Sequence, residues 1–254
     1  MQQVILPAGW VAPAGSLRGR VVLVAGAAGG VGGAAARAAA AAGATVVLLG
    51  RRVKPLERLY DELVAAGGAQ PAIYPLDLEG ATPEDHAMLA ERIEAECGRL
   101  DGIVLAAARF TGLIPLAQSE PLEFLRSIHV NLTAQWLLLQ SCLPLLARAD
   151  DPSVVFVLED AARVGKAYWG GYGVARHALA MLATMLASES ENSPLRVHGL
   201  LPPPLRTALR ARAYIAEDPT ALPAPDALAP AITYLLGPDG REARGCVLDL
   251  RTGA

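Results

Sequence analysis

A glycine-rich loop near the N-terminus is the first feature of this sequence that could do chemistry. The apolar run 20–25 leads into Gly26-Ala-Ala-Gly-Gly-Val-Gly32, and an alanine-rich segment with helical periodicity follows. Glycines between a strand and a helix permit a tight turn and let backbone N–H groups approach a pyrophosphate. We therefore expect Gly26, Gly30 and Gly32 to form a nucleotide-binding loop; a close-packed turn without a ligand is the alternative.

The residues after the second apolar run, 45–49, indicate which nucleotide would bind. A carboxylate there would accept a hydrogen bond from the ribose 2′-hydroxyl of NAD, whereas arginine accommodates the 2′-phosphate of NADP. The chain has Arg51 and Arg52 and no acid at this point. Cations at the start of a helix oppose its dipole, which favours a functional reason for them. We expect NADP rather than NAD, with Asp77 either near the adenine or a simple loop carboxylate.

The spacing of apolar residues predicts the elements that position this loop. Short runs that are apolar at nearly every position are typical of strands covered on both faces. Strands alternating with helices predict one Rossmann-like α/β domain over residues 1–254: a doubly wound parallel sheet of about seven strands with helices on both faces. The predicted strands are 20–25, 45–49, 70–76, 102–106, 153–158, 195–201 and 245–250, and the predicted helices are 31–42, 54–66, 83–96, 121–147, 169–189 and 224–236.

Two proline-rich segments, 202–204 and 219–230, are predicted to be loops, because proline continues neither a central strand nor a helix interior. They would lie beyond the carboxyl ends of the strands, where open α/β sheets bind ligands. We expect residues 202–230 to be a substrate-side loop region and residues 1–18 to be an N-terminal extension.

Three further features, with the glycine loop, make residues 19–253 resemble the short-chain dehydrogenase/reductase family. They are Asn131 between Val and Leu, Tyr172 with a cation four residues later, and Pro202 after the sixth strand. The segments 167–172 and 206–210 look like the bacterial YciK-like branch of that family. The resemblance implies an oxidoreductase that exchanges hydride between a nicotinamide cofactor and a small carbonyl or alcohol.

The resemblance also implies roles for single residues. In the family a tyrosine gives the proton, a lysine four residues later lowers its pKa and holds the ribose, and a serine thirteen residues earlier polarises the carbonyl. An asparagine supports a water relay. Tyr172 and Asn131 are present here, but Arg176 occupies the lysine position and Glu159 the serine position.

These two replacements predict damage to the ordinary reaction. Arg176 keeps a positive charge but stays protonated, so it cannot pass a proton along a relay. An ionised Glu159 only accepts hydrogen bonds, repels a developing oxyanion and raises the pKa of Tyr172. Loss of one oxyanion donor costs about 10²–10³ in rate. We expect Glu159 and Arg176 to form a salt bridge, each removing the other's cost of burial.

Other positions depart from the family pattern or match it. Residues 105–108 are Leu-Ala-Ala-Ala in place of Asn-Asn-Ala-Gly, which leaves Arg109 at the pocket mouth, and Pro203 replaces a glycine beneath the nicotinamide. Leu205 keeps a backbone N–H, and Thr207 matches a position that helps hold the carboxamide. Cofactor binding is therefore expected to survive in weakened form.

Composition excludes several classes of protein. With 53% hydrophobic and 19% charged residues the chain of 254 is not disordered, and a net charge of −3 gives no field for nucleic acid. Three separated cysteines and four scattered histidines suggest neither a disulfide framework nor a metal site. No stretch predicts a membrane span or a secretory signal, so we expect a cytoplasmic protein.

Three functions stay open at this point. The first is an NADP(H)-dependent oxidoreductase acting on an unknown small molecule, with Tyr172 as acid and base. The second is a non-catalytic nucleotide-binding sensor or partner subunit of an active relative. The third is a structural oligomer, against which the retained glycines and arginines argue. The resemblance implies a homodimer or homotetramer through helices 121–147 and 169–189, with Trp136 at the interface or in the core.

Overall fold

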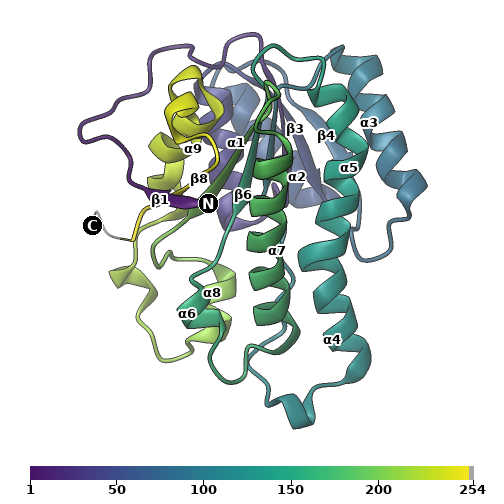
Figure 1. Cartoon of the computed structure of the whole chain (residues 1–254), viewed down its shortest axis with the longest axis vertical. Coiled ribbons are helices and arrows are strands. Elements are labelled where there is room, and N and C mark those ends of the chain that lie inside the picture. Colours follow the sequence, from purple (N-terminus) through teal and green to yellow (C-terminus); the bar gives the residue numbers. More distant parts are fainter. Residues whose placement is uncertain (252–254) are drawn as a thin grey trace.

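The computed structural model describes residues 1–251, which form one eight-stranded sheet (Figure 1). The order is β1-β8-β7-β6-β5-β2-β3-β4, and every neighbouring pair is parallel. The strand order reverses between β2 and β5, the position at which open α/β sheets form a ligand crevice. The strands are β1 Gln2–Val4, β2 Val21–Ala25, β3 Thr45–Gly50, β4 Ala72–Pro75, β5 Gly102–Leu105, β6 Ser153–Val157, β7 Arg196–Leu201 and β8 Cys246–Asp249.

Helices cover both faces of the sheet because parallel strands need crossover connections. Successive residues of β2 point to opposite faces: Val22 belongs to the core beneath α1, α2 and α9, and Leu23 to the core beneath α3, α5 and α7. The helices are α1 Gly30–Ala41, α2 Val53–Ala65, α3 Pro83–Cys97, α4 Pro121–Ile128, α5 Ala134–Leu146, α6 Ala161–Val164, α7 Gly170–Glu189, α8 Ala208–Ala213 and α9 Ala229–Leu236. The predicted fold class is confirmed.

The structure adds elements that the apolar pattern did not predict. The extension 1–18 contains β1, a three-residue strand beside β8 at the sheet edge. The predicted helix 121–147 is divided by a π-helical turn, His129–Thr133. The short helices α6 and α8 were also missed. Within the predicted loop 219–230, two short 3-10 turns precede α9, whose first turn holds Pro230, a position where no N–H is needed.

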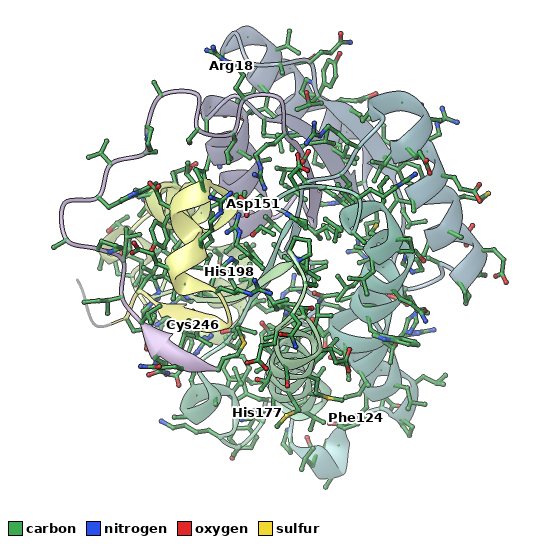
Figure 2. The ribbon with its side chains drawn as sticks, turned by 45° about the horizontal axis from the view of Figure 1, so that its top comes forward. Arg18, Phe124, Asp151, His177, His198 and Cys246 are labelled. Atoms are coloured by element: carbon green, nitrogen blue, oxygen red, sulfur yellow. The ribbon has the colours of Figure 1, made fainter. Side chains whose placement is uncertain are left out.

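Buried polar side chains form hydrogen bonds with one another near the amino ends of the strands. Arg196, at the start of β7, pairs with Asp151 at 2.9 Å and contacts the Nε2 atom of His198 at 3.2 Å. His198 in turn lies 2.9 Å from the carbonyl oxygen of Ala243 through its Nδ1 atom. Asp151 and His198 are labelled in Figure 2. These contacts satisfy buried charges far from the carboxyl ends of the strands, so the two edges have separate roles.

Candidate active site

A cavity of about 480 Å³ opens at the carboxyl ends of the strands. The glycine loop forms one wall, and the end of β6, helix α7 and the segment after β7 form the other. Asn131 and Gly32, both expected at the site, do not line the cavity. The expected residues that line the cavity are Gly26, Gly30, Arg51, Arg52, Asp77, Glu159, Tyr172, Arg176, Leu205 and Thr207.

The glycine loop has the geometry that its sequence predicts. Gly26 has φ +81°, and a Cβ there would lie 2.7 Å from the Cα of Ala107 on the neighbouring loop. A Cβ at Gly32 would lie 2.1 Å from the carbonyl oxygen of Gly26, so Gly32 is required for the turn itself. Helix α1 begins at Gly30 without a side-chain cap. Its first N–H groups are therefore available to an anion in the cavity.

Two arginines stand at the mouth of the cavity beside this loop. Arg51 and Arg52 follow β3 and are exposed, and neither pairs with a carboxylate among residues 1–251. Asp77 is also exposed, and its carboxylate accepts a hydrogen bond from the backbone N–H of Glu79 at 3.1 Å. The arrangement offers two unpaired cations next to the N-terminus of α1, as a phosphate group would require.

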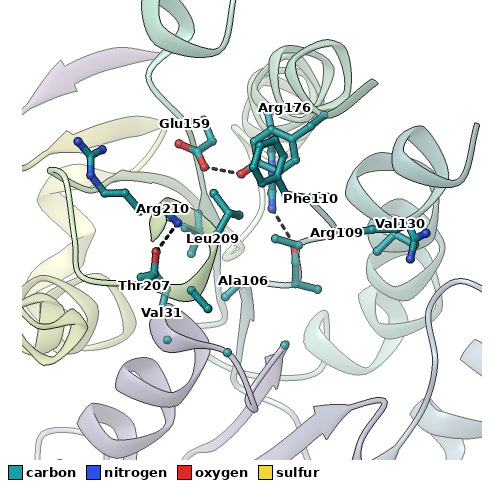
Figure 3. Close-up of a pocket in the computed structure, with 18 of the residues that line it drawn as sticks. Val31, Ala106, Arg109, Phe110, Val130, Glu159, Arg176, Thr207, Leu209 and Arg210 are labelled. Carbon is teal, nitrogen blue, oxygen red and sulfur yellow. Dashed lines mark hydrogen bonds between the residues drawn. The ribbon is translucent and has the colours of Figure 1, made fainter. Parts of the chain in front are cut away.

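Arg176 lies at the base of the cavity, where its side chain is almost completely buried. Its Nη2 atom donates to the carbonyl oxygen of Ala107 at 2.8 Å (Figure 3). The Nε and Nη1 atoms are buried and have no hydrogen-bond partner in the described chain. A buried guanidinium with two unused donors is costly unless a ligand supplies acceptors.

The expected salt bridge between Glu159 and Arg176 is wrong. Glu159 pairs instead with Arg163, four residues later, because the single-turn helix α6 brings that guanidinium back over the end of β6. Asp160 starts this helix by accepting a hydrogen bond from the N–H of Ala162 at 3.0 Å. The sequence signals were an N-capping aspartate and an i,i+4 acid–base pair, which together predict such a turn.

The other carboxylate oxygen of Glu159 accepts a hydrogen bond from the Tyr172 hydroxyl (Figure 3). Tyr172 is buried, and its ring lies 5.2 Å from that of Phe110 and 5.8 Å from that of Trp169. Burial raises the pKa of Tyr172 well above its usual range; the charge of Arg176 opposes this rise, and Glu159 adds to it. The phenol is therefore a neutral group whose proton points at a carboxylate.

Asn131 positions a neighbouring loop and does not face the cavity. Its side chain donates to the carbonyl oxygens of Arg109 and Ser127, both at 2.8 Å, and accepts from the N–H of Arg109 at 3.0 Å. Gln135, which the sequence analysis missed, donates to the carbonyl oxygen of Ala107 at 3.0 Å. The two amides fix the loop after β5, against which the glycine turn packs.

Arg109 lies at the mouth, as expected, where its two Nη atoms pair with carboxylates. It pairs with Glu79 at 2.8 Å and Glu123 at 2.6 Å, and Arg126 contacts the same two carboxylates at 3.3 and 2.7 Å. These four residues form a closed ring of alternating charge. Because each charge has two partners of opposite sign, the ring rigidifies the mouth without offering a cation to a ligand.

The segment after β7 forms part of the cavity wall opposite the glycine loop. Leu205 is buried against the core, and the hydroxyl of Thr207 caps α8 by accepting from the N–H of Arg210 at 3.2 Å. Arg210 pairs with Glu217 through two contacts of 2.6 Å. Thr207 therefore uses its hydroxyl to hold this segment in place, a role that the resemblance did not imply.

Within residues 1–251 no three His, Cys, Asp or Glu side chains come together in a way that could hold a metal ion. None of the described helices has the length and apolar character needed to cross a membrane.

Comparison with known proteins identifies the family. Residues 20–218 match the short chain dehydrogenase family. The oxidoreductase YciK of Escherichia coli strain K12 is 36% identical over 237 residues, which is 93% of this chain and 94% of YciK. A short chain dehydrogenase from Pseudomonas syringae is 42% identical, with a TM-score of 0.90 and coverage of 94% and 98%. One from Escherichia coli CFT073, complexed with NADPH, is 36% identical, with a TM-score of 0.89 and coverage of 93% and 99%. The chain belongs to the short-chain dehydrogenase/reductase family, and it is similar to YciK.

Proposed function

We propose that this protein is an NADP(H)-binding oxidoreductase in which the ordinary reduction of small carbonyls is impaired. The observation that carries cofactor binding is Arg176, which lines the cavity bordered by the glycine loop and whose Nε and Nη1 atoms are buried without a hydrogen-bond partner in the described chain. A ribose would supply the missing acceptors. The cofactor, when bound, supplies hydride exchange at its nicotinamide ring.

Each part of a dinucleotide has a matching group on this chain. The glycine loop and the N-terminus of α1 would hold the pyrophosphate. Arg51 and Arg52 would hold a 2′-phosphate, which favours NADP over NAD, and Asp77 would lie near the adenine. The relative from Escherichia coli CFT073, which is 36% identical, is complexed with NADPH, and this supports NADP(H) as the cofactor.

The impairment follows from where the donors point. The proton of Tyr172 is directed at Glu159, and no serine hydroxyl is present at position 159 to polarise a carbonyl. An ionised carboxylate would also repel the charge that develops on a carbonyl oxygen during reduction. Pro202 and Pro203 line the same cavity and restrict the backbone there.

Titration of the protein with NADPH and NADH, followed by cofactor fluorescence, tests the binding proposal. NADPH is expected to bind more tightly than NADH, and Arg51→Ala with Arg52→Ala should remove that preference. Arg58→Ala, on the exposed face of α2 outside the cavity, is the matched control and should retain it. Failure of both nucleotides to bind would overturn the proposal.

A non-catalytic nucleotide-binding protein is the alternative, because the hydroxyl of Tyr172 already has an internal acceptor. The two functions differ in turnover. Binding of NADP(H) without oxidation or reduction of any carbonyl or alcohol in a broad panel supports the alternative. Turnover that Tyr172→Phe abolishes supports the enzyme.

We also propose that the protein forms a homodimer or homotetramer through α4, α5 and α7. Trp136 is half exposed, which favours an interface position over a core one. Other large apolar side chains exposed on these helices are Leu122, Leu125, Val174, Met181 and Met185. Sedimentation of the wild type and of Trp136→Glu tests this, since a charge at the interface should produce a monomer.

A further inference from the structure

We propose that Glu159 is the terminal proton acceptor of a relay through Tyr172, and that this relay adapts the site to oxidise a secondary alcohol. The inference rests on the proposed binding of NADP(H). It assigns Glu159 a function where the family resemblance implies only a loss.

The relay is already assembled in the structure. The Tyr172 hydroxyl donates to one carboxylate oxygen of Glu159, and Arg163 binds the other. The lone pairs of the phenol oxygen stay available to accept a hydrogen bond from a substrate hydroxyl. The guanidinium of Arg163 lies 5.2 Å from the ring centroid of Trp169, which fixes it beside the carboxylate.

The route that the family uses for protons is closed here. Arg176 remains protonated and donates to the carbonyl oxygen of Ala107, so it cannot transfer a proton. Asn131 is fully buried, and its amide is occupied by Arg109 and Ser127. A proton that leaves a substrate therefore needs another acceptor.

Glu159 provides that acceptor and a path for the proton to reach solvent. Its side chain is 16% exposed and that of Arg163 is 23% exposed, whereas Tyr172 is buried. Water can therefore reach the carboxylate. A proton received by Glu159 can pass to solvent, which resets the site for another turnover.

The step balances as a two-electron oxidation. The O–H bond of the alcohol breaks as a new O–H bond forms on Tyr172, and the original phenol proton moves to a carboxylate oxygen of Glu159. The C–H bond at the same carbon breaks, its electron pair and hydrogen pass to the oxidised nicotinamide, and the C=O bond forms. Tyr172 stays neutral throughout, so its high affinity for its proton is no obstacle.

The surroundings of the relay indicate the kind of alcohol. Phe110 and Leu209 line the cavity beside Glu159, and the nearby guanidinium of Arg210 is neutralised by Glu217 (Figure 3). An apolar body would fit against these side chains, with its hydroxyl toward Tyr172. These side chains therefore favour an alcohol with apolar substituents.

Rates of oxidation with NADP⁺ for a panel of apolar secondary alcohols test the relay. Glu159→Gln should lower kcat by about 10²–10⁴, the usual contribution of a general base, with the Kd for NADPH changed less than about twofold. Glu91→Gln, an exposed site on α3 outside the cavity, should match the wild type.

A second readout does not depend on turnover. Ultraviolet difference titration, with Tyr172→Phe subtracted, should show Tyr172 ionising at a lower pH in Glu159→Gln than in the wild type. Unchanged oxidation in Glu159→Gln would refute the relay, as would NADPH binding by a wild type that oxidises no alcohol in the panel. Absence of NADPH binding would instead refute the proposed function.

Discussion

The hydroxyl of Tyr172, on α7, donates to the carboxylate of Glu159, thirteen residues earlier at the end of β6. This contact links the positions that the family uses for its acid and its carbonyl-polarising group. It also changes the carbonyl-polarising group from a hydrogen-bond donor to an acceptor, because an ionised carboxylate only accepts hydrogen bonds whereas a serine hydroxyl would donate one.

Restoring the family residues should restore carbonyl reduction. Glu159→Ser with Arg176→Lys returns a donor to the oxyanion and a group that can transfer a proton. We expect the rate of NADPH-dependent carbonyl reduction to rise by about 10²-fold, at the lower end of what one oxyanion donor contributes. Stopped-flow oxidation of NADPH measures this. No increase, in a double variant that binds NADPH normally, would mean that Pro202 and Pro203 block the nicotinamide instead.

Asn131 should matter for stability more than for chemistry. Asn131→Ala leaves the backbone N–H and carbonyl of Arg109 without their partner, and each buried group left unsatisfied costs about 1–3 kcal/mol. Urea unfolding should therefore show a loss of about 2–6 kcal/mol for the two groups together. Asn192→Ala, an exposed site, should change stability by less than about 0.5 kcal/mol. Equal stabilities of the two variants would show that the hydrogen bonds between Asn131 and the backbone of Arg109 do not stabilise the fold.

Two buried histidines should make the fold sensitive to acid. Burial lowers the pKa of His198 to about 3, with the charge of Arg196 adding to the effect, and burial lowers the pKa of His86. Both pKa values lie below the unfolded value of about 6.5, so the unfolded chain binds more protons as the pH falls below it. Stability is fully present above this pH and is lost below it.

For His198 the loss should continue down to about pH 3, at about 1.4 kcal/mol per pH unit. Urea unfolding at successive pH values measures the slope. His86 is fully buried and neither of its ring nitrogens has a partner in the described chain, so His86→Leu should be less sensitive to acid than the wild type. His177→Gln, at an exposed site on α7, serves as the control. A slope that is the same in His86→Leu and the wild type would exclude His86 as a contributor.

Tyr168 should be a site where glycine stabilises the protein. It has φ +78°, the only positive value at a non-glycine residue among residues 1–251, and its side chain is exposed. The strain of about 1–3 kcal/mol exceeds the entropic cost of a glycine, about 0.4–1 kcal/mol, so Tyr168→Gly should be more stable. Lys166→Gly, nearby with negative φ, should be less stable. Thermal unfolding compares the two, and a destabilised Tyr168→Gly would show that the tyrosine side chain contributes more than the strain removes.

The sequence was sufficient to predict those parts of the fold and of the site that depend on a local pattern of residues. Strands buried on both faces leave unbroken apolar runs, and the glycine turn leaves its own spacing, so both were predicted. The partner of Glu159 was not, because Arg163 reaches it only through the one-turn helix α6. The contacts of Asn131 with the loop after β5 were also not predicted, because Asn131 lies in a π-helical turn that apolar periodicity does not reveal. Strand β1 is too short to stand out and gains its pairing only from β8.

Calorimetric titration of NADPH into the wild type and into Arg176→Met tests the central claim most directly. Methionine keeps much of the buried volume but removes the two donors that have no protein partner. The wild type should bind NADPH, and Arg176→Met should bind it at least about tenfold more weakly, since a hydrogen bond to a charged donor contributes about 1.5–3 kcal/mol. Equal affinity in the two proteins, or no heat of binding in the wild type, would contradict the account.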